Sequence, residues 1–149
     1  MPFRLAPHDS CSFCGYLAGE LECTFVARTE RVAAFVNRAQ YERGAMLVVP
    51  VAHRPTILEM ADAELAGVYG LAKRLAGAAE QAFGAVGVNV FQNNGIKAGQ
   101  HVPHFHVHVV PRYETSDSEK IFLQREFAIT PRDEQQRIAD AIRAVLSAA

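Results

Sequence analysis

Three histidines, His104, His106 and His108, alternate with apolar residues in the segment from Gln100 to Arg112. A period of two is the signature of a β-strand, so the sequence predicts that the imidazoles leave one face of a strand and the apolar side chains the other. Imidazoles titrate near neutrality and act as proton carriers, nucleophiles or metal ligands. Burying all three would require a partner for each ring nitrogen, so they cannot simply form core. The alternative to a functional site is that the three histidines bind metal incidentally or lie on the surface without a role.

Two cysteines near the start of the chain, Cys11 and Cys14, form a Cys-x-x-Cys pair. Such a pair can be half of a zinc site, a redox pair or two unrelated thiols. The redox interpretation favours a thioredoxin-like βαβ unit, which the order of the expected elements does not contain. A closed structural zinc site needs four ligands, and two cysteines with two histidines are a common set. The third cysteine, Cys23, receives no functional prediction.

The elements that must position these residues are predicted from apolar periodicity and turn signals. A long helix is expected to begin near Asp62, as its N-cap, and to end near Phe83. A second helix is expected to start at Thr130-Pro131, with proline at its first position. Strands are expected over residues 24–28, 32–37, 45–51 and 88–92 and in the histidine segment. The long helix should bury one apolar stripe, made of Leu65, Val68, Tyr69, Ala72, Leu75, Ala76 and Ala79. This order of elements indicates an α+β fold.

Length and composition restrict the class of protein. A chain of 149 residues, half of them apolar and with a formal net charge of −1, is expected to be one domain. Residues 1–10 are predicted to be a flexible lead-in and residues 11–149 the domain. The charge provides no basic field for nucleic acid and no polybasic membrane anchor. The first residues do not resemble a signal peptide, and no apolar run approaches the roughly 20 residues that span a bilayer. A cytoplasmic location is the default expectation.

The histidine segment resembles the motif that gives the histidine triad superfamily its name. Asn93-Asn94-Gly95 and Gly99-Gln100 precede it at the spacing of that family, and Leu47-Val48-Val49-Pro50 followed by His53 is similar as well. Together with Cys11-Ser12-Phe13-Cys14, these motifs resemble the bacterial zinc-type members over roughly residues 11–112. Residues 113–149 are then a C-terminal extension with a helix. The resemblance implies a five-stranded, mainly antiparallel sheet with one long central helix, and a homodimer.

The resemblance also implies an enzyme that hydrolyses or transfers nucleotide conjugates, of the dinucleoside polyphosphate or nucleoside phosphoramidate type. His106 would attack the α-phosphate and form a nucleotidyl-histidine that water resolves. His108 would hydrogen-bond the phosphate, Gln100 would lie on the phosphate side, and His104 would orient His106 through its backbone carbonyl. The alternative is a nucleotide-binding regulatory module with little or no turnover.

The resemblance places a purine nucleotide or nucleotide conjugate against Phe35, Asn37, Asn93, Gln100, His101 and His108, and zinc on Cys11, Cys14, His53 and His104. Two residues depart from the usual pattern. Asn37 stands where relatives carry an acid on the ribose hydroxyls, so the charge of that contact is missing. His101 stands where relatives carry serine or threonine near the phosphate. It is an additional phosphate donor, a leaving-group acid or a solvent-facing loop residue.

Overall fold

A single antiparallel sheet organises the chain, in a computed structural model that describes residues 3–119 and 128–148. Neighbouring strands follow the order β1-β2-β3-β5-β4 and every pair is antiparallel. The strands are β1 (Phe25–Arg28), β2 (Val32–Val36), β3 (Met46–Pro50), β4 (Gly87–Gln92) and β5 (Val107–Arg112). The predicted α+β architecture with a five-stranded antiparallel sheet is confirmed.

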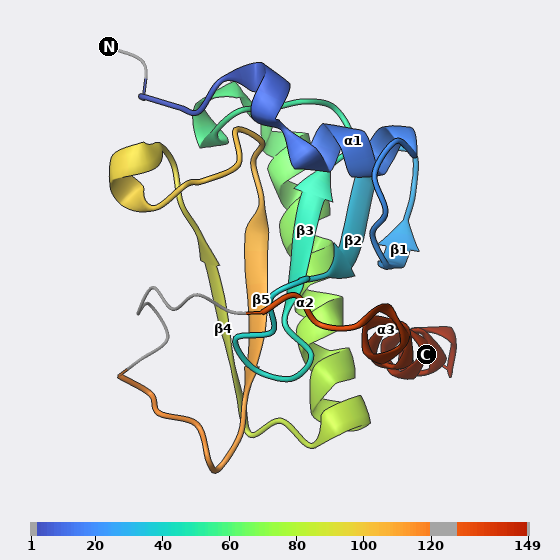
Figure 1. Ribbon diagram of the computed structural model, residues 1–149. Helices are drawn as coiled ribbons and strands as arrows, with labels where there is room; N and C mark the ends of the chain where they lie inside the picture. The colour runs from blue at the N-terminus through green and yellow to red at the C-terminus, as the bar shows by residue number, and fades with distance from the viewer. Residues whose placement is uncertain (1–2, 120–127, 149) are drawn as a thin grey trace.

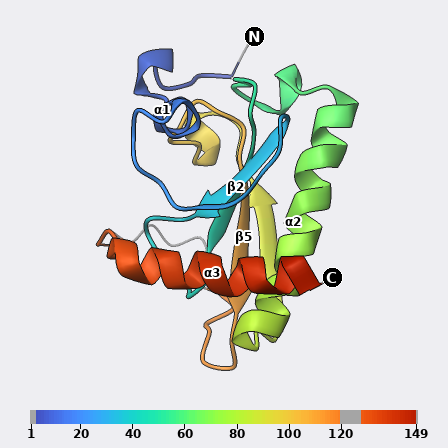
Figure 2. The ribbon, with the colours of Figure 1, turned by 90° about the vertical axis from the view of Figure 1, so that its right-hand side faces the viewer.

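Helices cover both faces of this sheet (Figures 1 and 2). The long helix α2 (Asp62–Phe83) and the C-terminal helix α3 (Arg132–Ala148) pack on one face, and the short helix α1 (Ser12–Ala18) packs on the other. We call these the α2 face and the α1 face. Strands β2 and β3 send apolar side chains to both faces, which explains their continuous apolar runs. The α1 face buries Phe13, Tyr16, Ala33, Phe35, Leu47 and Val49, and the α2 face buries Ala34, Val36, Met46 and Val48.

Local side-chain hydrogen bonds fix the predicted hairpin and the start of the long helix. The hydroxyl of Thr29 accepts the backbone N–H groups of Arg31 (3.2 Å) and Val32 (3.1 Å), which closes the turn between β1 and β2. Helix α2 begins at Asp62, but its N-cap is Ala61, whose N–H donates to the Glu64 carboxylate at 2.8 Å. Asp62 is therefore the first helical residue and not the predicted cap.

The histidine strand is shorter than the sequence predicts. Strand β5 starts at Val107, so His104 and His106 precede it. Pro103 has no N–H, and the N–H of Phe105 donates to the carbonyl of Arg54 and not to a neighbouring strand. The alternation of faces nevertheless extends back through the segment. Phe105, Val107 and Val109 lie in the α2-face core, whereas His104 and His106 contact Phe13 on the α1 face.

Two helix predictions are also corrected. Tyr69 keeps 41% of its surface exposed, because it lies beside the apolar stripe of α2 and not on it. The fully packed positions of that stripe are Val68, Leu71, Ala72, Leu75, Ala78 and Ala79. Helix α3 starts at Arg132, one residue later than predicted, because the carbonyl of Pro131 accepts the first helical hydrogen bonds. Within residues 3–119 and 128–148, no helix is long and apolar enough to cross a membrane.

The residues before α1 have defined neighbours. A 3₁₀ turn over His8–Ser10 leads into α1, and the backbone carbonyl of Arg4 accepts the N–H of Ile96 at 2.8 Å. The flexibility expected of residues 1–10 stays a prediction, and residues 1 and 2 lie outside the described part of the chain. Residues 120–127 and 149 of the predicted C-terminal extension lie outside it as well.

Candidate active site and metal centre

Four predicted ligands from three separate segments meet at one end of the sheet. Cys11 is the N-cap residue of α1 and Cys14 lies in its first turn, His53 follows β3, and His104 precedes β5. The candidate ligand atoms of these four side chains all lie within 4.8 Å of one another. The segments are far apart in sequence, so the sheet and α1 together create the cluster.

The distances between these atoms match the edges of a tetrahedron around one metal ion. Zinc–sulfur bonds of about 2.3 Å and zinc–nitrogen bonds of about 2.0–2.1 Å give sulfur–nitrogen edges of about 3.5 Å and a nitrogen–nitrogen edge of about 3.3 Å. The Nδ1 atom of His104 lies 3.5 Å from Cys11 Sγ, 3.6 Å from Cys14 Sγ and 3.3 Å from His53 Nδ1. The Nδ1 atom of His53 lies 3.2 Å from Cys14 Sγ and 3.8 Å from Cys11 Sγ. The donor set and its spacing are those of a structural zinc site.

Neighbouring groups orient the ligands. His104 donates from Nε2 to the carbonyl of Pro50 at 2.8 Å, which leaves Nδ1 free to coordinate. The N–H of Cys14 donates to Cys11 Sγ at 3.4 Å and favours a thiolate there. Burial raises the pKa of Cys14 to about 11 and lowers the pKa of His104 to about 4. A divalent cation would instead lower the pKa of the Cys14 thiol, because it stabilises the thiolate.

His106 is held as a nucleophile requires. Its Nδ1 lies 2.7 Å from the carbonyl oxygen of His104, which can only accept, so Nδ1 carries the proton. Its Nε2 then bears a lone pair. Burial lowers the pKa of His106, although the hydrogen bond to the carbonyl opposes that change. The expected contact between the His104 carbonyl and His106 is therefore present.

His108 lies beside His106 on the same face of the sheet. The two ring centroids are 5.0 Å apart, and the His108 ring stacks on Phe91 of β4 at 4.5 Å and 9°. Burial, with a smaller contribution from His106, lowers the pKa of His108 to about 3. Its Nδ1 is buried and has no hydrogen-bond partner within the described residues. A polar atom in this condition is one that a bound ligand or an ordered water satisfies.

Helix α1 connects the metal cluster to His106 through an aromatic residue that the sequence analysis did not assign to the site. Phe13 stands between the two cysteines, and its ring meets His106 edge-on at 5.0 Å and Phe35 at 5.2 Å. Tyr16, one turn later, meets Phe35 at 5.4 Å. The Cys-x-Phe-Cys pattern could have identified Phe13, because it places an aromatic ring between two ligands.

Gln100 lies in the loop before the histidines, and its predicted role on the phosphate side stays a prediction. It is 1% exposed, and its side chain is hydrogen-bonded inside the protein. Its Oε1 accepts the N–H of Gly95 at 2.7 Å, and its Nε2 donates to the carbonyls of Pro55 (2.7 Å) and Val102 (3.0 Å). With both N–H groups used, the side chain positions the loop before the histidines.

The other predicted nucleotide contacts lie in loops that end strands. Asn37 follows β2, is 9% exposed and accepts the N–H of Ala39 on Oδ1 at 3.1 Å. Asn93 follows β4. His101 is exposed, and it lies near enough to His106 for its charge to lower the pKa of that residue. The structure therefore brings His101 and His108 to His106, and the ring of Phe13 lies between Phe35 and His106. It places Asn37 and Asn93 at strand ends.

Comparison with known proteins identifies the family. The sequence profile of the HIT domain matches residues 18–115. The "Protein hit" of Bacillus subtilis is 39% identical over 110 residues, which are 73% of this chain and 75% of that protein. This chain belongs to the histidine triad (HIT) family.

Solved HIT structures extend the likeness to almost the whole chain. A Hit-like protein from Bartonella henselae superposes with a TM-score of 0.83 at 28% identity and covers 93% of this chain and 98% of its own. A Zn-bound histidine triad family protein from Mycobacterium smegmatis superposes with a TM-score of 0.78 at 28% identity, over 96% and 100% of the two chains.

Several relatives carry enzyme names. An adenosine 5'-monophosphoramidase of Schizosaccharomyces pombe is 35% identical over 69% of this chain and 74% of its own. An asymmetrical bis(5'-nucleosyl)-tetraphosphatase of the same yeast is 33% identical over 66% of this chain and 54% of its own. An adenylylsulfatase of Arabidopsis thaliana is 28% identical over 71% and 54%. At the level of the family, these names indicate a hydrolase of nucleotide conjugates.

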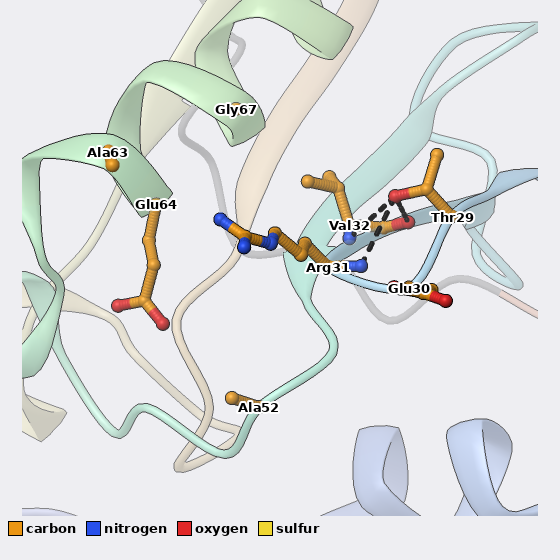
Figure 3. A pocket seen from close by; sticks show the side chains of 8 residues that line it. All are labelled: Thr29, Glu30, Arg31, Val32, Ala52, Ala63, Glu64 and Gly67. Carbon is orange, nitrogen blue, oxygen red and sulfur yellow. Dashed lines mark hydrogen bonds between the residues drawn. The ribbon is translucent and has the colours of Figure 1, made fainter.

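A pocket on the α2 face is separate from the histidines of this HIT protein. It lies between the β1–β2 turn and the first turns of α2, and Arg31 and Glu64 stand on opposite sides of it (Figure 3). Glu64 is paired with Arg54 at 2.9 Å. None of the predicted site residues lines this pocket, whose walls are Thr29, Glu30, Arg31, Val32, Ala52, Ala63, Glu64 and Gly67.

Proposed function

We propose that this HIT protein hydrolyses or transfers nucleotide conjugates through a covalent nucleotidyl-His106 intermediate. The observation that supports it is the hydrogen bond from His106 Nδ1 to the His104 carbonyl, which leaves a lone pair on Nε2 beside His108. The hydrolase names among the relatives support the same class of reaction.

In the proposed reaction, the Nε2 lone pair attacks the α-phosphorus and the bond from phosphorus to the leaving group breaks. The leaving group departs with that electron pair and takes a proton from water or from a nearby imidazole, for which His101 is our candidate. Water then attacks the phosphorus and loses a proton to the imidazole that protonated the leaving group, or to solvent, while the bond to Nε2 breaks and Nε2 regains its lone pair. Phe13 and the buried surroundings restrict water around His106, which strengthens polar contacts to the phosphate.

The remaining residues would bind and position the substrate. His108 would meet the phosphate, Asn93 would contact the phosphate or the leaving group, and Phe35 with Asn37 would contact the purine nucleoside. Gln100 would act indirectly, since its amide holds the preceding loop. We infer that zinc is the resident ion of the four-residue cluster and that it serves the structure of this region.

Turnover of adenosine 5'-phosphoramidate and of a diadenosine polyphosphate, measured side by side, tests the function and its substrate class. We expect at least one to be hydrolysed, with a mass increase of one nucleotidyl group on a peptide that contains His106. Nucleotide binding without turnover of either substrate, or of adenylylsulfate, would instead support a regulatory module.

Replacing Asn37 by aspartate is expected to change selectivity for the sugar. A carboxylate over the ribose hydroxyls would form charge-assisted hydrogen bonds and improve discrimination of ribose from deoxyribose by about 1 kcal/mol. The Ala39 N–H contact to position 37 survives, since aspartate also accepts it. Competition by AMP and dAMP measures the ratio, and an unchanged ratio would remove Asn37 from the ribose contact.

We also propose that the protein forms a homodimer through β4. This strand pairs only with β5 among the described strands, and Val88 (39%) and Val90 (40%) stay exposed on it. An exposed apolar edge strand associates readily with another chain, and a second copy can extend the sheet across a two-fold axis. A cytoplasmic location stays a prediction.

Introducing charge on this edge should weaken the dimer. We expect Val88→Lys and Val90→Lys together to raise the dimer dissociation constant at least about tenfold, or roughly 1.4 kcal/mol, by like-charge repulsion and desolvation. Sedimentation velocity over a concentration series measures it, with Ile129→Ala, at an exposed apolar residue outside β4, as the control. A monomeric wild-type protein at all concentrations would contradict the proposal.

A further inference from the structure

The residues before α1 join the loop that follows β4. We call residues 3–10 the N-terminal segment and residues 93–99 the 93–99 loop. The Arg4 carbonyl accepts the N–H of Ile96 at 2.8 Å, the first N–H of the short turn Ile96–Ala98. Phe3 lies against Gly95, since a Cβ placed on that glycine would be 3.3 Å from Phe3 Cβ and 3.5 Å from the Arg4 oxygen.

The other end of the N-terminal segment is fixed at the metal cluster. The N–H of Cys11 donates to the carbonyl of His8 at 3.0 Å, and Ser10 donates to Pro7 in the same turn. The His8 ring meets the His53 ring edge-on, with centroids 4.1 Å apart. The segment thus runs from two metal ligands to the 93–99 loop, over the end of the sheet that carries α1 (Figure 1).

Contacts inside the 93–99 loop connect Gly95 and Ile96, which contact the N-terminal segment, to Asn93. The carbonyl of Gly95 accepts the N–H groups of Ala98 and Gln100, each at 3.0 Å, and Gly99 donates to Ile96 at 3.0 Å. A Cβ placed on Gly99 would lie 3.5 Å from Asn93 Nδ2. A shift at residues 95 and 96 therefore moves the surface on which the Asn93 amide rests.

We propose that the N-terminal segment positions the 93–99 loop for the leaving-group side of the reaction, and that the metal cluster anchors the segment. Phe3 is a positioning residue in this scheme, because it acts on the substrate only through Gly95 and Asn93. The proposal rests on the proposed function for its effect on turnover. Its structural part, the protection of the Ile96 amide, is independent of that function.

Replacing Phe3 by glycine tests the proposal. We expect faster hydrogen exchange at the Ile96 amide and a roughly tenfold lower kcat for adenosine 5'-phosphoramidate, since displacements near 1 Å cost up to about 10²-fold in rate. Affinity for AMP, which has no leaving group, should stay within about twofold, and the zinc content should not change. Phe3→Leu keeps Cβ and Cγ against Gly95 and should restore kcat.

Removal of zinc from the wild type by a chelator should also speed exchange at Ile96, because it releases the anchored end. Ile129→Ala, an exposed apolar residue outside these contacts, is the matched control and should change neither quantity. The proposal would be overturned by unchanged Ile96 exchange in Phe3→Gly, by faster exchange with unchanged kcat, or by a lower kcat in Phe3→Gly that is accompanied by loss of zinc from that variant. If the wild type turns over no nucleotide conjugate, the proposed function fails, while the exchange result still decides whether the segment holds the loop.

Discussion

Replacing His106 by asparagine is expected to lower kcat by at least about 10⁴-fold, because a covalent pathway cannot proceed without its nucleophile. The side-chain amide nitrogen of asparagine lies close to the place of the histidine Nδ1, so it can still donate a hydrogen bond to the carbonyl of His104. Nucleotide affinity and the melting temperature should therefore stay close to those of the wild type. Initial rates, calorimetric titration with AMP and thermal unfolding measure the three quantities.

Retention of substantial kcat in this variant would remove His106 from the nucleophilic role. A second variant makes the test specific for chemistry at this nitrogen. His106→Gly leaves a space of about the size of an imidazole, and added imidazole should restore part of the rate without a covalent link to the chain. Trapped nucleotidyl-protein should be found in the wild type and be lost in both variants.

Elements governed by local chemistry were predicted well from the sequence. The hairpin depends on the Thr29 hydroxyl and residues next to it, and the end of α2 depends on Gly84, which takes the left-handed conformation at φ 69°. The predicted start of β5 was wrong because a hydrogen bond to a residue far away in the sequence sets it. The Arg54 carbonyl takes the N–H of Phe105, and no periodicity within the histidine segment records that contact.

The metal cluster and the nucleophile differ in how far the sequence predicts them. His53 and His104 could be assigned as ligands only by resemblance, because 51 residues separate them, and the sheet brings their Nδ1 atoms to 3.3 Å. The orientation of His106 followed from one residue two positions earlier. The hydrogen bonds of the Gln100 side chain were not evident from the sequence, since its partners Gly95 and Pro55 lie in different loops that meet only in the folded chain.

His104 belongs to both sites and separates their functions. Its Nδ1 faces the cysteines, its Nε2 donates to Pro50, and its carbonyl accepts from His106. Under the proposed function, the ring of this residue would therefore serve the metal, and only its backbone carbonyl would serve the reaction. Substitutions at the cysteines and at His106 should for this reason affect different properties of the protein.

Replacing Cys11 or Cys14 by serine is expected to remove the metal and to lower the stability of the fold. A ligand present at about 1,000 times its dissociation constant contributes about 4 kcal/mol to the folded state. For a chain of this length, that loss lowers the melting temperature by roughly 10 °C. Cys23→Ser is the matched control, because Cys23 lies outside the four-residue cluster and should keep the metal. His106→Asn should keep the metal too.

Elemental analysis of protein purified without chelator tests the zinc assignment. We expect about one zinc per chain in a tetrahedral site of two sulfurs and two nitrogens. Metal-free wild-type protein, or a disulfide between Cys11 and Cys14, would overturn the zinc assignment and leave the His104 ring without a ligand role.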